Sequence, residues 1–181
     1  MLIPIYTFAC IMVIVWARLS DRTGVRSTFI MIGQGCNALG QIGLLAIPHP
    51  KYPGLTYFLL FICLFGIFAP QQLLVSWTAN NTAPSSKRAI AMALLLSGGN
   101  LSGVVGSNIF VAWQSPRYWA GYGTCLFTAL TGMTMAFFLR KTYEKINAER
   151  DLITEEQIKE MYTEAQLLDM GDKSPYFRYT L

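Results

Sequence analysis

Five long runs of apolar residues follow one another up to Leu139 of this 181-residue chain. Apart from Arg18 near the end of the first run, they hold no Asp, Glu, Lys or Arg. A helix needs roughly 20 such residues to cross the hydrocarbon core of a bilayer. The sequence therefore predicts five transmembrane helices, over about residues 2–19, 27–47, 55–78, 89–113 and 118–139.

The length and pattern of these runs also indicate the fold class. They are about twice as long as a membrane-spanning strand and do not alternate polar with apolar positions, which argues against a β-barrel. We predict an all-α membrane protein, with residues 1–140 as a transmembrane domain and residues 141–181 as a cytosolic tail. A solvated helix is expected over about 142–168, with a capping box at Thr154 to Gln157. The tail either keeps this end soluble or docks on a partner.

Charge is divided unevenly along the chain. Residues 1–140 contain eight Lys or Arg and one acid, Asp21, whereas residues 141–181 contain six Lys or Arg and nine acids. The cations of the membrane part lie mainly in the first and third connections, and further cations follow the last span. The positive-inside tendency then predicts that this multi-pass membrane protein has its N-terminus outside and its C-terminus in the cytoplasm. We expect it in the plasma membrane. Topology accounts for the basic residues, so the charge does not indicate nucleic-acid binding.

The start of the chain lacks the features of a removable signal peptide. Met1 leads directly into apolar residues, without a basic segment or a small-residue cleavage site. The first span is also the shortest, and it reaches full length only if Arg18 snorkels to the interface. We therefore expect the chain to begin within a longer protein.

Catalytic chemistry usually needs clustered His, Cys, Asp or Glu, and the spans contain only four isolated cysteines. We predict no enzymatic activity, no metal and no cofactor. Uncharged polar residues are plentiful instead. Within a bilayer they either bond between helices or line a wet cavity.

The fourth span is the richest in such residues. Small residues recur every four positions there, and Gly99, Gly103 and Gly106 are predicted to let a neighbouring helix approach closely. Asn100 lies near the middle of the span and Asn108 about two turns later. These amides could serve either of two roles, packing between helices or lining a cavity. We favour the cavity for Asn100, because an amide at the bilayer centre is costly without a partner.

Amides recur in the third and second spans. Pro70 removes a helix hydrogen bond beside Gln71 and Gln72, which could then contact a solute. Asn108, Asn100 and these two glutamines are the predicted solute-binding residues. In the second span, three amides form one narrow stripe: Gln34, Asn37 and Gln41. We favour hydrogen bonding between helices for this stripe, and cavity lining is the alternative.

The first connection carries a more specific motif. Residues 17–26 read Ala-Arg-Leu-Ser-Asp-Arg-Thr-Gly-Val-Arg. This sequence resembles the G-x-x-x-D-R-x-G-R-[KR] loop of the major facilitator superfamily, with matches at Asp21, Arg22, Gly24 and Arg26. An acid between arginines can pair with cations in one conformation and release them in another. The resemblance implies a conformational role for this loop; a plain topogenic loop is the alternative.

The rest of the chain also resembles this superfamily. Residues 75–88, 97–108, 116–118 and 171–179 are similar to the last part of the fungal allantoate, nicotinate and pantothenate permease group. The resemblance implies helices eight to twelve of a twelve-helix fold, with an outside N-terminus and a cytoplasmic C-terminus.

The function implied is that of a proton-coupled symporter of small organic anions or vitamins. Its solute would sit between two six-helix halves, so this C-terminal portion is expected to be incomplete and inactive alone. The alternative is a non-transporting membrane protein that assembles with a partner subunit or scaffolds through its cytosolic tail. Assembly of several copies into a pore is a third interpretation.

Overall fold

A computed structural model describes residues 3–47, 51–110, 114–115 and 118–181 of the chain, without the side chain of Leu168. Within these residues the fold is helical and contains no strand. Its elements are α1 (Ile3–Thr23), α2 (Arg26–Ala46), α3 (Pro53–Asn80), α4 (Ser85–Ile109), α5 (Trp119–Asp151), α6 (Glu155–Met161), α7 (Glu164–Met170) and the 3₁₀ turn η2 (Gly171–Lys173).

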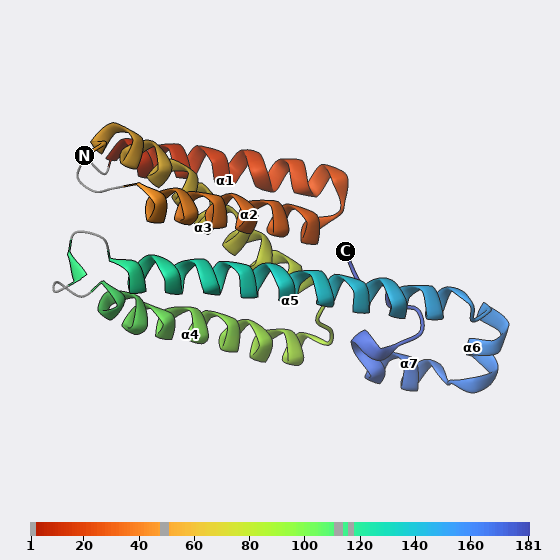
Figure 1. The fold of residues 1–181 in the computed structure, drawn as a ribbon. Coiled ribbons are helices and arrows are strands. Elements are labelled where there is room, and N and C mark those ends of the chain that lie inside the picture. The colour runs from red at the N-terminus through yellow and green to blue at the C-terminus, as the bar shows by residue number, and fades with distance from the viewer. Residues whose placement is uncertain (1–2, 48–50, 111–113, 116–117) are drawn as a thin grey trace.

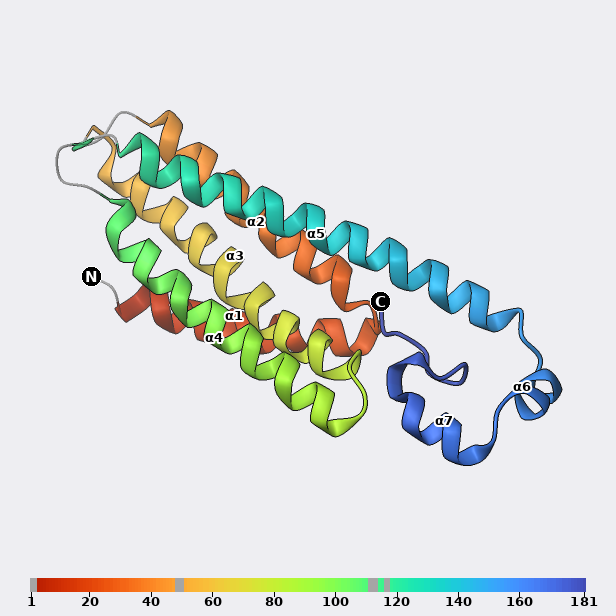
Figure 2. The ribbon, with the colours of Figure 1, turned by 90° about the horizontal axis from the view of Figure 1, so that it is seen from below.

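The five long helices lie side by side in a bundle (Figures 1 and 2). Helix α2 packs against both α3 and α5, and α1 packs mainly on α3. Helix α4 lies on a flank, and none of its side chains, all of which are described, is buried. Where α1 and α3 end and α2 and α4 begin, the chain's C-terminus lies beside them (Figure 2). We call this the tail-side end of the bundle.

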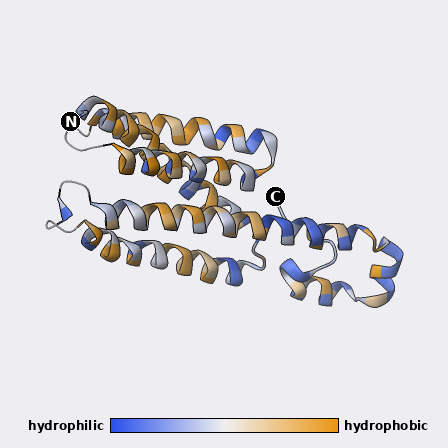
Figure 3. Cartoon of the chain, in the orientation of Figure 1, coloured by the Kyte–Doolittle hydropathy of each residue, from blue (hydrophilic) through white to orange (hydrophobic). Residues whose placement is uncertain are grey.

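All five long helices are long and apolar enough to cross a membrane. Apolar residues predominate along the five long helices, while polar residues gather toward the end of α5 and beyond it (Figure 3). Ile3, Leu94 and Phe127 are among the most exposed large side chains, at 69% or more. Such exposure suits lipid contact, because hydrocarbon does not penalise apolar surface.

Glycines allow α2 and α3 to pack closely. A Cβ atom added at Gly66 would lie 2.5 Å from the backbone nitrogen of Asn37, and one added at Gly40 would lie 2.5 Å from Cys63 Sγ. A Cβ atom added at Gly33 would likewise lie too close to the ring of Pro70. The mid-helix proline of α3 is therefore buried against a glycine of α2. This contact holds the two helices that carry most of the polar residues described below.

The predicted spans coincide with the five helices, but helix ends differ from the ends of the apolar runs. Helix α1 continues to Thr23 and α5 continues to Asp151, past the predicted boundary at residue 140. Backbone hydrogen bonding does not stop where apolar composition stops. The predicted limits Leu2 and Trp113 lie outside the described residues.

The tail differs from the single helix expected over residues 142–168. Helix α5 ends at Asp151, and α6 and α7 follow as separate short helices. The expected capping box is present, with Thr154 N donating to Gln157 Oε1 at 3.2 Å. A second box begins at Thr163, whose backbone nitrogen donates to Gln166 Oε1 at 3.0 Å. Each box starts a new helix in a new direction, which turns the chain back toward the bundle.

Candidate solute-binding cavity

A cavity of about 650 Å³ lies between α2, α3, α4 and α5. All of its described lining residues are uncharged. The polar side chains that line it come from all four helices: Gln34, Asn37, Gln41, Gln71, Asn100, Ser102 and Thr128. Amides offer both donors and acceptors, so this lining suits a solute with several hydrogen-bonding groups.

The polar stripe of α2 forms one wall of the cavity. Asn37 and Gln41 are buried, and Gln41 Nε2 donates to Asn37 Oδ1 at 3.4 Å. Both residues belong to α2, so this hydrogen bond does not join two helices. The sequence had led us to favour bonding between helices for this stripe. Among the described residues, Gln41 Oε1 has no hydrogen-bond partner. A buried acceptor of this kind is costly unless a ligand, water or another chain bonds to it.

Two of the four predicted solute-binding residues line the cavity. Gln71 contributes from α3 and Asn100 from α4, and both residues are exposed within the described chain. The structure does not bring the other two into this lining. Gln72 is exposed on α3, and Asn108 Nδ2 donates to Val104 O at 2.8 Å and to Ser107 Oγ at 3.2 Å within α4.

The glycines of α4 have room around them. Gly99 lines the cavity, and Cβ atoms added at Gly99, Gly103 or Gly106 would meet no described heavy atom within 4 Å. The close packing predicted for them therefore stays a prediction. Helix packing through glycine is seen instead between α2 and α3.

Sequence reasoning missed several cavity residues. Thr128 on α5 and Ser102 on α4 line the cavity but carry no signal beyond being small polar residues at membrane depth. Trp77 of α3 lines its tail-side end and is only 2% exposed. It packs there with Ile30 of α2 and Ala136 of α5. The sequence places Trp77 in the same span as Gln71 and Gln72, but that position alone does not assign it to a cavity.

The residues of the first connection lie together at the tail-side end. Arg26 Nη2 forms an ion pair with Asp21 Oδ1 at 2.9 Å, and Arg26 Nη1 donates to the carbonyl oxygen of Ser76 at 3.2 Å. Arg26 thus joins the connection to the end of α3. Gly24 adopts a φ of +70°, and its nitrogen donates to Ser20 O at 3.0 Å, which closes α1. Arg22 is exposed in the last turn of α1, where a cation favours the helix dipole.

Comparison with known proteins identifies the family. The sequence profile of the Major Facilitator Superfamily matches residues 2–168. The chain belongs to the major facilitator superfamily. Together with the five apolar helices, this membership makes it an integral membrane protein.

Several fungal transporters of the major facilitator superfamily are similar to it. The MFS-type transporter cnsO of Penicillium expansum is 34% identical over 98% of this chain and 35% of its own length. The high-affinity nicotinic acid transporter of Saccharomyces cerevisiae is 31% identical over 99% of this chain and 33% of its own length. The chain thus spans about a third of these relatives. No solved structure matches it.

Proposed function

We propose that this chain is the C-terminal part, helices eight to twelve, of a proton-coupled symporter of small organic anions or vitamins. The cavity would then form one side of the solute site. The observation that carries this proposal is the convergence of amides from three helices, Gln41, Gln71 and Asn100, on a single cavity at membrane depth. Amide groups in a low-dielectric site bind a polar solute more strongly than they do in water.

The flank of the bundle supports the idea that further helices complete this site. Helix α4 buries no side chain, and, apart from the cavity-lining Gly99, its glycines Gly103 and Gly106 face open space within the described chain. The relatives are about three times as long as this chain. We propose that helices present in the relatives pack on this face of α4, as transporters with two halves require.

The solute class is proposed from the relatives and from the chemistry of the cavity. One relative is named a high-affinity nicotinic acid transporter. Nicotinic acid carries a carboxylate and a ring nitrogen, both hydrogen-bond acceptors, and the NH₂ groups of Gln71 and Asn100 are donors. Gln72 and Asn108 stay proposed contacts, for a solute that extends beyond the described cavity.

Uptake tests the proposal directly. Cells would express this chain alone and together with the first seven helices of a similar transporter. Labelled nicotinate, allantoate and pantothenate would be supplied at acidic external pH. We expect uptake only with the added helices, and collapse of the proton gradient should abolish it. No uptake in either case, with the chain present in the plasma membrane, would favour a non-transporting protein that assembles or scaffolds through its tail.

We also propose that the first connection is a conformational loop of this transporter, on its cytoplasmic side. Arg26 is the central group, because it contacts both Asp21 and the end of α3 through Ser76. The side chain of Asp21 is 61% exposed and so can separate from Arg26 at little cost.

Protease access to a C-terminal tag in intact and permeabilised cells tests the proposed orientation, in which the C-terminus is cytoplasmic. Cleavage of the tag in intact cells would overturn that orientation.

A further inference from the structure

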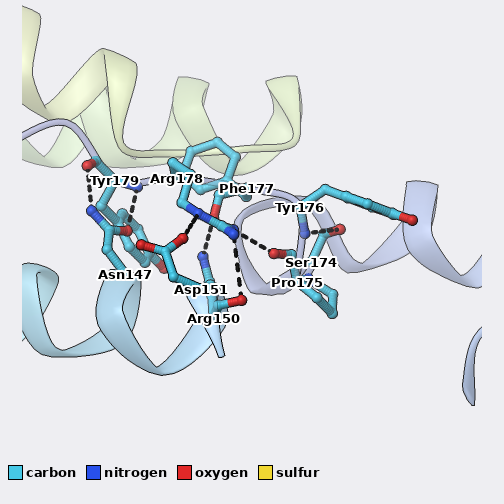
Figure 4. Close-up of polar contacts among 9 residues, drawn as sticks. All are labelled: Asn147, Arg150, Asp151, Ser174, Pro175, Tyr176, Phe177, Arg178 and Tyr179. Carbon is cyan, nitrogen blue, oxygen red and sulfur yellow. Dashed lines mark hydrogen bonds and ion pairs between the residues drawn. The ribbon is translucent and has the colours of Figure 1, made fainter. Parts of the chain in front are cut away.

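The last residues of the chain fold back onto the tail-side end of the bundle. Residues 171–181, which we call the strap, lie beside the end of α3, the α3–α4 connection and the second half of α5 (Figures 2 and 4). The strap follows the short helices α6 and α7, in which Ile158 is the one buried side chain among those described. The position of the strap depends on side chains of the bundle that bind its main chain.

The end of α3 binds the strap at Thr180. Trp77 Nε1 donates to the carbonyl oxygen of Thr180 at 2.7 Å, and Asn81 Nδ2 donates to the same oxygen at 3.0 Å. The backbone nitrogen of Thr180 donates to Asn81 Oδ1 at 2.7 Å. Asn81 is 5% exposed. A buried amide whose donor and acceptor both bond to the main chain of one residue makes a specific contact.

Helix α5 binds the neighbouring residue. Asn147 Nδ2 donates to Tyr179 O at 2.8 Å, and Tyr179 N donates to Asn147 Oδ1 at 2.9 Å (Figure 4). The ring of Tyr179 stacks on Tyr143 with a centroid distance of 4.3 Å and an interplanar angle of 3°. The guanidinium of Arg150 lies 4.9 Å from the centre of the Tyr179 ring. Residues 179 and 180 therefore tie α5 to α3.

The start of the strap is fixed on the α3–α4 connection and on the first turn of α4, which carries Lys87. Lys87 Nζ forms an ion pair with Asp172 at 2.5 Å, and the Asp172 side chain is only 12% exposed. The backbone nitrogen of Asp172 donates to Ala83 O at 3.2 Å. Gly171 has a φ of +56°, and a Cβ added there would lie 2.6 Å from Ala83 O. Only glycine fits this close approach without displacement.

Trp77 joins the strap to the cavity. Its indole ring lines the tail-side end of the cavity and packs against Ile30, Leu73 and Ala136, while its nitrogen is bonded to Thr180. The Tyr143 ring, which stacks on Tyr179, meets the Trp77 ring edge-on with a centroid distance of 5.7 Å. We propose that the strap is an intramolecular latch, which holds Trp77 across the tail-side end of the cavity and keeps water out of that end. This inference does not depend on the solute.

Quenching of Trp77 fluorescence tests the latch. The full chain would be reconstituted in lipid nanodiscs with Trp16, Trp113 and Trp119 replaced by phenylalanine, so that Trp77 alone emits. Three changes release the strap: deletion of residues 171–181, Asn81→Ala and Tyr179→Ala. Tyr176→Ala is the matched control. Tyr176 lies in the strap and is 46% exposed, and its side chain forms no hydrogen bond or ring contact with the other described residues. Circular dichroism checks that each variant keeps its helices.

We expect each releasing change to shift Trp77 emission to the red and to raise its acrylamide quenching constant severalfold. Tyr176→Ala should match the parent. If the deleted chain keeps its helical signal and Trp77 remains as protected as in the parent, the strap does not seal the cavity. If the deleted chain does not fold, Asn81→Ala and Tyr179→Ala decide, and parental quenching in both overturns the proposal.

Discussion

The contact between Gly66 of α3 and α2 gives a prediction whose size follows from the structure. In Gly66→Ala the new Cβ would lie 2.5 Å from the backbone nitrogen of Asn37 and 2.7 Å from Gly33 O. Backbone atoms cannot rotate away, so the helices must separate. Overpacking of this kind costs about 1–3 kcal/mol. Replacement of a helical glycine by alanine returns about 0.5–1 kcal/mol. We therefore expect a net loss of up to about 2.5 kcal/mol.

The assay is unfolding of the purified chain in detergent, followed by circular dichroism against heat or denaturant. Gly35→Ala is the control, because a Cβ at Gly35 in α2 meets nothing within 4 Å. It should be neutral or slightly stabilising through helix propensity. Equal stability of Gly66→Ala and Gly35→Ala would refute the close packing of α2 on α3. Because Asn37 lines the cavity, the separation should also weaken solute binding in a completed transporter.

Three further predictions concern the first connection and the cavity. Gly24→Ala should destabilise the chain by about 1 kcal/mol, because φ is +70° there, and an unchanged melting temperature would contradict this. Asp21→Ala should alter stability by less than about 1 kcal/mol, since the Asp21 side chain of the ion pair with Arg26 is 61% exposed. It should slow transport once the other helices are supplied, and unchanged transport would argue against a conformational role for this loop. Asn100→Ala should weaken solute affinity more than protein abundance, and loss of abundance alone would make Asn100 a packing residue.

Amino-acid composition was sufficient to predict the five helices, because lipid excludes charge from each span and requires every backbone group to be bonded within it. Helix ends were harder to predict. Thr23 and Asp151 lie in helices that extend into polar sequence, where composition gives no boundary. The division of the tail into α6 and α7 depended on a second capping box at Thr163, which resembles the one recognised at Thr154.

The cavity could be predicted only in part, because α3 and α4 have no distinct apolar face. Gln71 lines the cavity together with its neighbour Pro70, whereas Gln72 points about 100° further round α3 and lies outside the described lining. Asn108 lies about 12 Å along the axis of α4 from Asn100, beyond the described lining. Choosing among such amides requires the positions of neighbouring helices. Those positions result from glycine contacts such as Gly66 with Asn37, which no local pattern specifies.

The strap lay beyond prediction for a different reason. Trp77 and Thr180 are 103 residues apart, and the bonds of Thr180 involve its main chain, so its own side chain carries no signal. The sequence does show the residues that bind the strap, because Asn81 and Asn147 are amides near the ends of α3 and α5. Such amides need partners once they are buried.

The two groups of glycines show how far a small-residue pattern can be interpreted. Gly33, Gly40 and Gly66 occur in α2 and α3, and each faces an atom of the other helix. The series in α4 is denser, yet Gly103 and Gly106 face open space. A small residue permits close approach but does not identify the partner. Because α4 also buries no side chain and the relatives are about three times as long, we propose that the open series packs against a partner outside this chain and not against lipid.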